Sequence, residues 1–166
     1  MNLSGVFDLH KKLFKELNLL TAKPQLFLLN GSEDDVPAEL ITEIKEINAD
    51  YIVADLDLVK EVPELIRKTY EILNLMSFFT TGEDETRAWT IEKGTKAPQA
   101  AGTIHSDFEK NFIRAEVVKY EKLVAAARSA SSGQDAWNAA KQKGWLRLEG
   151  KEYVVEDGDV MVIRHG

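Results

Sequence analysis

Basic and aromatic side chains alternate along one stretch of the sequence, and together they offer the chemistry of a nucleic-acid contact. The basic members are Arg87, Lys93, Lys96, Lys110, Arg114 and Lys119. Such side chains neutralise backbone phosphates, and the interleaved rings of Trp89, Phe108 and Phe112 could stack on bases. The same rings could instead fill the core of a small domain, and for Trp89, which is flanked by strand residues, the core is the favoured place.

Other chemistries find little support in the residues. No G-x-x-x-x-G-K-[ST] segment is present, so nothing predicts a phosphate-cradling loop, and Gly94-Thr95-Lys96 has the residue types without the spacing. The three histidines lack metal-ligand spacing. For His105 a helix cap or core packing is favoured over catalysis. We therefore predict no catalytic residue and no metal ligand.

An acidic segment near the end of the chain, Glu156-Asp157-Gly158-Asp159, has two interpretations. Three carboxylates in four residues could hold a metal ion. Asp-Gly is also a common turn sequence, because both residues tolerate the backbone angles of tight turns. The turn is the favoured interpretation.

The composition is that of an ordinary globular protein. The chain has 166 residues, of which 44% are hydrophobic and 30% charged, and it has no cysteine, which excludes disulfides and thiolate chemistry. No apolar run approaches the roughly 18–20 residues that a membrane span needs. Charged residues such as Asp8, Lys11 and Lys12 interrupt the apolar residues of the N-terminus, so we expect no signal peptide. A cytoplasmic protein without membrane contact is predicted.

Charge is unevenly distributed along the chain. Residues 1–76 carry 8 basic and 14 acidic residues, a balance of −6, and residues 77–166 carry 13 and 14, a balance of −1. Within the latter, residues 87–147 carry 11 basic and 6 acidic residues, a balance of +5. A locally basic stretch therefore lies within an acidic chain, which fits either an RNA-binding surface or an ordinary solvated surface.

Residues 1–76 are predicted to contain a helix at 6–20 and then an α/β unit. Residues 25–29 form a short apolar run typical of a buried strand, and Pro37 marks the start of a helix. A second strand at 51–54 and a helix at 57–75 follow. This alternation predicts parallel strands. Two strands make a poor sheet, so the unit looks like part of a larger domain.

Residues 77–166 are predicted to form an α+β domain of β-grasp type. Strands are expected at 86–91 and 111–119, with a short helix at 98–104 between them and helical structure over 120–143, broken near residues 131–133. The runs 153–155 and 160–163 flank the acidic turn, which predicts a hairpin or another tight strand connection.

Three strings in this second part resemble one known family. RAWTIEKGTKAPQAAGTIHSDFEKNFIRAEVVKYE at 87–121, YVVEDGD at 153–159 and the preceding FFTTGEDETRAWT are similar to the TGS domain of the YchF/Obg-like ATPases. The resemblance implies a β-grasp TGS domain over 77–166. It also implies that residues 1–76 are a partial Rossmann-like P-loop NTPase domain, in which the 6–20 helix ends a coiled coil.

The resemblance further implies a nucleotide-base loop after the first strand. Members of this family carry N-x-x-E where most P-loop GTPases carry N-K-x-D, a change linked to accepting ATP. Asn30, Gly31 and Glu33 match that pattern. The family's next base-contacting loop should fall near Ala54-Asp55-Leu56, where this sequence departs from the usual Ser or Cys.

These observations predict a non-catalytic RNA- or ribosome-binding module with a remnant base-recognition loop. It needs no cofactor, although weak ATP or GTP binding is compatible with the loop. Two alternatives stay open: the C-terminal half of an active ATPase whose P-loop half is supplied separately, and a protein–protein regulatory module. Open sheet edges in residues 1–76 also allow a homodimer.

Overall fold

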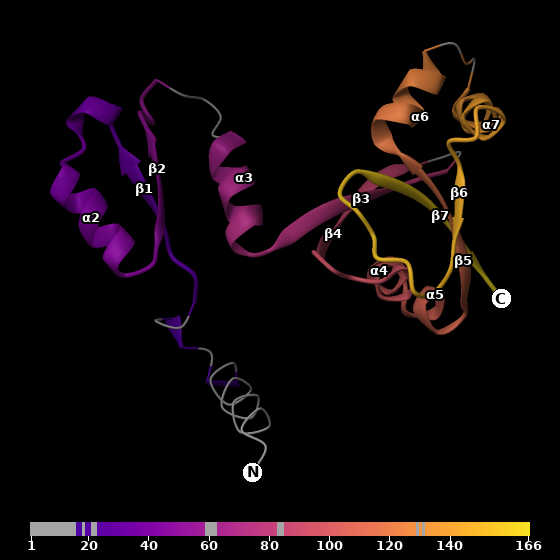
Figure 1. Ribbon diagram of the computed structural model, residues 1–166, viewed down its shortest axis with the longest axis horizontal. Helices are drawn as coiled ribbons and strands as arrows, with labels where there is room; N and C mark the ends of the chain where they lie inside the picture. Colours follow the sequence, from indigo (N-terminus) through magenta and orange to yellow (C-terminus); the bar gives the residue numbers. More distant parts are fainter. Residues whose placement is uncertain are drawn as a thin grey trace. The chain divides into compact units, whose positions relative to one another are not determined.

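The computed structural model describes residues 16–17, 19–20, 23–58, 63–82, 85–128, 130 and 132–166. Contacts divide the chain into two compact units, Met1–Ile72 and Leu73–Gly166, whereas the sequence places the boundary after residue 76. Most of the helix expected at 6–20 lies outside the described residues. Figure 1 shows the helices and strands of each unit.

The first unit has the predicted alternation of strands and helices. Its elements are β1 (Leu26–Asn30), the 3-10 helix η2 (Glu33–Asp35), α2 (Ala38–Glu46), β2 (Asp50–Ala54) and α3 (Pro63–Ile72). β1 and β2 pair in parallel, from Leu26 opposite Asp50 to Asn30 opposite Ala54. The prediction that the first strand is buried is wrong. None of its side chains is fully buried, and Phe27 is 37% exposed. Among the described residues β1 pairs only with β2, so little covers it.

The helix predicted at 57–75 is shorter in the structure. α3 ends at Ile72, Asn74 takes a left-handed backbone conformation with φ of 55°, and β3 starts at Leu75. Asparagine tolerates this region better than most residues, so it ends the helix. The spacing of apolar residues continues from the helix into the following strand, so the sequence pattern did not reveal where the helix ends. Residues 59–62 of the predicted helix lie outside the described residues.

The second unit is built on a five-stranded mixed sheet. Its strands are β3 (Leu75–Thr81), β4 (Thr86–Glu92), β5 (Phe112–Lys119), β6 (Arg147–Glu149) and β7 (Asp159–His165), in the order β4-β3-β7-β5-β6. The first strand of the unit, β3, and the last, β7, pair in parallel near the centre, and the other pairs are antiparallel. The unit therefore combines a mixed sheet with helices, in agreement with the predicted α+β class.

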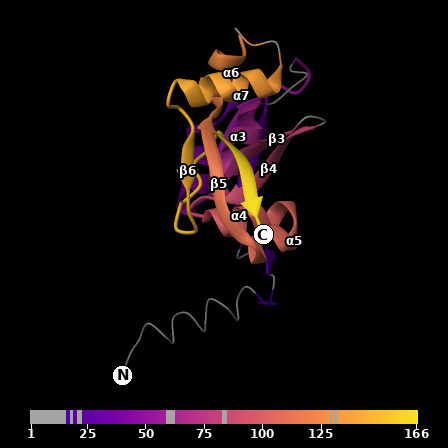
Figure 2. The same ribbon diagram turned by 90° about the vertical axis from the view of Figure 1, so that its right-hand side faces the viewer.

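Helices cover both faces of this sheet. They are α4 (Ala97–Ile104), α5 (Ser106–Lys110), α6 (Tyr120–Ala127) and α7 (Gly133–Gln142). Val117 and Met161 point to the side of α4 and α5, whereas their neighbours Val118 and Val160 pack with α6 and α7. Since successive strand residues point to opposite faces, the two helix pairs lie on opposite sides of the sheet (Figures 1 and 2).

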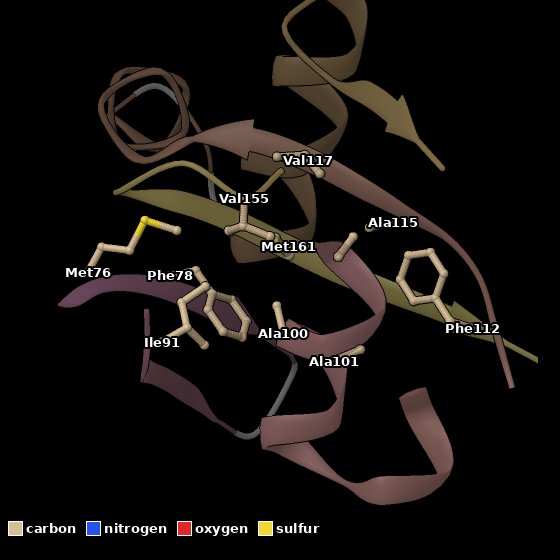
Figure 3. Packing of buried hydrophobic residues seen from close by; sticks show 11 residues of the cluster. Met76, Phe78, Ile91, Ala100, Ala101, Phe112, Ala115, Val117, Val155 and Met161 are labelled. Atoms are coloured by element: carbon tan, nitrogen blue, oxygen red, sulfur yellow. The ribbon is translucent and has the colours of Figure 1, made fainter. Parts of the chain in front are cut away.

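The larger core lies between the sheet and α4. Figure 3 shows Phe78, Met161 and Val117 of the strands facing Ala100 and Ala101 of the helix. These five side chains are fully buried. The small alanine side chains let the helix backbone approach the sheet closely, so that the large side chains of the strands pack against it.

The tight connection predicted around residues 156–159 is present, but the hairpin alternative is wrong. Val154 pairs with Lys96 rather than with β7, and Val155 N–H donates to Thr95 O at 3.0 Å. The turn itself is fixed to β3, because Gly158 N–H donates to Ser77 O at 2.9 Å. None of the helices in the described part of the chain is long and apolar enough to cross a membrane.

Candidate functional site

The loop predicted to read a nucleotide base lies at the carboxyl end of the parallel pair β1 and β2. Asn30, the last residue of β1, accepts a hydrogen bond through Oδ1 from Leu56 N–H at 3.0 Å. Gly31 N–H donates to Ala54 O at 3.2 Å, and Gly31 has a φ of 142°, a conformation that favours glycine. The loop after β1 is thus tied to the loop after β2, and the carboxamide of Asn30 is held in one orientation.

Glu33 begins the 3-10 helix that follows. Its neighbour Ser32 donates to Asp35 Oδ2 through both Oγ, at 2.6 Å, and its backbone N–H, at 3.2 Å. The side-chain bond from Ser32, followed by the backbone bond, lowers the pKa of Asp35. Asp35 is therefore engaged in capping, whereas the carboxylate of Glu33 is exposed and accepts no hydrogen bond from the described residues.

Asn30 and Glu33 together can present an amide donor and a carboxylate acceptor at the end of a strand. This is the edge of a parallel sheet at which α/β proteins bind ligands. The pair has the chemistry to recognise hydrogen-bonding groups on a base edge. The sequence carries no Gly-rich loop of the G-x-x-x-x-G-K-[ST] type beside this pair.

Two of the six candidate RNA-binding residues are engaged in ion pairs within the second unit. Lys96 Nζ lies 2.6 Å from Glu152 Oε2. Lys119 Nζ lies 2.8 Å from Glu156 and 3.1 Å from Asp159. Partial burial alone would lower the pKa of Lys119, but hydrogen bonds and charges of the two carboxylates outweigh it and raise that pKa.

The other four candidates are exposed and lie on separate elements. Arg87 is on β4, where its guanidinium stacks 4.3 Å from the centre of the Trp89 ring. Arg114 is on β5, which is separated from β4 by two strands. Lys93 follows β4, and Lys110 is the last residue of α5. Their side chains form no ion pair with the described residues. The structure thus does not bring the six residues into one cluster.

The aromatic residues mostly serve packing. Trp89 is half-buried against the larger core and donates through Nε1 to Thr80 Oγ1 at 2.9 Å, which confirms its favoured core role. Phe112 is buried, and Phe108 packs against the same core. His105 caps α5, since its Nδ1 accepts from Asp107 N–H at 3.2 Å, as expected.

The acidic turn holds a buried charge that sequence patterns do not reveal. Asp159 is fully buried, and its Oδ2 accepts from Tyr153 Oη at 2.6 Å and from Glu156 N–H at 2.9 Å. Its Oδ1 lies 3.1 Å from Lys119 Nζ and 3.5 Å from Arg147 Nη2. Asp159 therefore links β7 to β5 and to the segment before the turn. The described residues contain no group of three or more His, Asp or Glu side chains that could hold a metal ion.

A polar groove lies on the α7 side of the sheet and was not anticipated. It has a volume of about 670 Å³ and is lined by Thr81, Gly82, Glu116, Ser132, Gly133, Gln134, Trp137, Asn138, Lys141, Val162 and Arg164. Arg164 and Glu116 are 48 residues apart. Only the pairing of β5 with β7 brings them together, and one charged residue near a strand end is a weak signal in the sequence.

Comparisons with known proteins place this architecture in a family. A family model described as YchF-GTPase_C, a protein of unknown function (DUF933), matches residues 75–166. "Ribosome-binding ATPase YchF" of Bacillus subtilis is 44% identical over 93% of this chain and 48% of its own length. "Obg-like ATPase 1" of Homo sapiens is 37% identical over 94% of this chain and 44% of its own length.

A solved structure shows the same fold. The structure of the Schizosaccharomyces pombe YchF GTPase aligns with a TM-score of 0.63 and 33% identity, covering 92% of this chain and 46% of that one. The chain spans about half the length of the curated relatives it matches. It belongs to the YchF C-terminal domain family, in agreement with the resemblance seen in its sequence.

Proposed function

We propose that this chain is a non-catalytic module that binds the ribosome through RNA, and that it retains a base-recognition loop at Asn30, Gly31 and Glu33. The observation that carries the proposal is the match of residues 75–166 to the YchF family model, in a unit with its own sheet and core. Two relatives, from Bacillus subtilis and Haemophilus influenzae, are named as ribosome-binding ATPases.

The fold of the second unit supports its assignment as a β-grasp TGS domain. Numbered within the unit, the strands run second, first, fifth, third and fourth across the sheet, with first and last strands parallel at the centre. Helix α4 follows the second strand and precedes the third along the chain, and it packs on one face of the sheet. A β-grasp sheet has a mixed arrangement of this kind, which supports the assignment, and α6 and α7 add a second helical layer.

Co-sedimentation of the full chain with ribosomes tests the function. Binding should be measured across a salt series, because phosphate contacts release counterions and weaken as salt rises. We expect binding that is strongest at low ionic strength and falls steadily with added salt. An absence of binding even at the lowest salt would exclude the proposal.

Nucleotide binding by the remnant loop is a separate part of the proposal. Without a P-loop the phosphates lack their main contacts, so we expect only weak ATP or GTP binding and no required cofactor. Titration of the chain with each nucleotide, compared with the Asn30→Asp variant, tests it. Binding that is unchanged in the variant would show that Asn30 does not contact the base.

A second candidate is the C-terminal half of an active ATPase. The observation in its favour is that ATPase relatives are about twice as long as this chain. Mixing the chain with the P-loop half of Bacillus subtilis YchF tests it: restored ATP hydrolysis supports it, and a failure to associate excludes it. A protein–protein regulatory role, or a homodimer through the first unit, would fit the acidic balance and the open strands of residues 1–76, and both are checked by the mass of the complexes formed.

A further inference from the structure

The polar groove of the second unit is framed by one helix and the open part of the sheet. Gln134, Trp137, Asn138 and Lys141 recur at helical spacing along α7 and form one wall. Val162 and Arg164 of β7, with Glu116 of β5, form the floor. The volume of about 670 Å³ lies in the range of ligand-binding clefts.

A set of contacts crosses the floor and holds it in shape. Glu116 Oε1 accepts from Arg164 Nε at 3.0 Å, and Glu116 Oε2 accepts from Trp137 Nε1 at 3.4 Å. Burial alone would raise the pKa of Glu116, but the bonds from Arg164 and Trp137 outweigh it and lower that pKa. Glu116 is therefore an ionised, occupied acceptor that orients Arg164, rather than a free carboxylate.

The groups left over in the groove are mostly donors. Arg164 uses only Nε for Glu116, so its two Nη nitrogens form no hydrogen bond with the described residues. Lys141 makes no ion pair within 4.0 Å among the described residues and acts on Glu116 only at longer range. Gln134 donates to Asn138 Oδ1 at 3.4 Å, which leaves the Asn138 amide nitrogen as a further donor. Arg114, paired with Arg164 across β5 and β7, adds positive charge on the same face.

We infer that this groove binds the sugar–phosphate backbone of a single RNA strand, with Arg164 and Lys141 on phosphates and the amides of α7 on sugar or base groups. The inference rests on the proposed ribosome-binding function and assigns it a site. Guanidinium groups suit phosphate because they donate in a planar fork, and RNA-binding grooves track the backbone with basic side chains.

The test uses the full chain with two probes, purified ribosomes and a single-stranded RNA oligonucleotide of mixed sequence. The main variant combines Arg164→Gln with Lys141→Gln. Each lost phosphate contact should lower the slope of log affinity against log salt by about 0.7. For the pair we expect a slope smaller by about 1.4 and an affinity at about 0.1 M salt that falls by more than about tenfold.

A charge-matched control and a second variant make the result specific. Lys122→Gln with Lys151→Gln removes two exposed positive charges that do not line the groove, and we expect less than about a threefold loss. Asn138→Asp keeps the shape of the α7 wall but adds a negative charge, and it should weaken the binding of both probes. Unchanged thermal melting in every variant excludes unfolding as the cause.

The outcomes distinguish a failure of the groove assignment from a failure of the proposed ribosome-binding function. Losses confined to the groove variants with both probes support the site. Equal losses in the groove and control variants, or wild-type binding by the groove variants, overturn the site while ribosome binding itself stands. A loss with ribosomes but not with the oligonucleotide overturns the RNA assignment in favour of a ribosomal protein. No ribosome binding by the unmodified chain overturns the proposed function.

Discussion

Among the described residues of the first unit, the buried hydrophobic side chains are Ile44 and Ile52, whereas the second unit buries two clusters around Phe78 and Val118. In the first unit Phe27, Ile47 and Ile66 remain 37%, 59% and 62% exposed. A two-stranded sheet cannot bury much apolar surface by itself. The two halves therefore differ in what holds them: the second unit has its own core, and the first needs further cover to become equally stable.

This difference separates the two proposed sites. The groove sits on a sheet whose strands are fixed by packing on both faces, so its side chains are positioned in advance. The base loop is held by two hydrogen bonds between the ends of a marginal strand pair. Binding at the groove should consequently survive changes that weaken the first unit, whereas binding at the loop should not.

Truncating the second core should have the largest effect. Phe78 is fully buried, and Phe78→Ala should lower the free energy of unfolding of the second unit by about 3–5 kcal/mol, since it removes apolar contacts and leaves a cavity. The three tryptophans, at 89, 137 and 145, all lie in this unit, so tryptophan fluorescence during urea unfolding reports on it alone. Ile52→Ala is the control from the first unit and should leave that transition unchanged. A shared shift would show that the units unfold together.

Breaking the buried carboxylate network should come next. Asp159→Asn removes the charge that faces Lys119 and Arg147, whose side chains are 28% and 41% exposed. Removing one partner of a buried pair costs about 3–5 kcal/mol, and partial solvation of both cations reduces our expectation to about 2–3 kcal/mol. The same fluorescence transition measures it. Glu156→Gln, which removes the exposed partner of Lys119, should cost less than about 1 kcal/mol, and equal losses would contradict a special role for Asp159.

The structure also shows which elements sequence patterns could predict and which they could not. Local periodicity and turn residues predicted β1, β2, β4, β5, α4, α6 and α7 to within a few residues. The three-residue β6 and the five-residue α5 are too short to carry a period. The hairpin predicted at 153–163 is absent because Val154 pairs with Lys96, which is distant in the sequence, and not with β7.

The sequence also predicted only part of the two candidate sites, but for a different reason. Asn30, Gly31 and Glu33 are close in sequence, so a short motif can identify the loop they form. The contacts of Asp159 with Lys119 and of Glu116 with Arg164 span 40 and 48 residues. Residue type and spacing hold no information about such pairs until the strand register is known. For this reason a groove formed by Arg164 and Lys141 was not predicted, although a basic surface was.

Tyr153 should give a smaller, pH-dependent effect. Burial, followed by the hydrogen bond and charge of Asp159, raises the pKa of its hydroxyl above the usual 10.0. Because the folded pKa is the higher one, this stabilisation is fully present below about pH 10 and is lost as the pH rises through the folded value. Tyr153→Phe should cost about 1–2 kcal/mol at neutral pH and should flatten the loss of stability at alkaline pH.

The tyrosine absorbance gives an independent readout of the same group. The chain has four tyrosines, and in the native protein the one that ionises last should be absent from the Tyr153→Phe titration. If the latest-ionising tyrosine persists in the variant, the hydroxyl that Asp159 holds is not the one with the raised pKa.

The smallest effect should be confined to the base loop. Asn30→Ala removes the acceptor for Leu56 N–H, which should weaken the local fold by about 1 kcal/mol without moving the tryptophan transition of the second unit. Hydrogen exchange at the Leu56 amide should accelerate about fivefold as a result. Asn30→Asp is the matched control, since a carboxylate at the same position can still accept this bond while losing the amide donor offered to a base. Protected exchange in Asn30→Asp, together with lost nucleotide binding, would separate the structural role of the side chain from its recognition role. Accelerated exchange in both variants would instead mean that the carboxamide orientation itself, and not the acceptor, holds the two loops together.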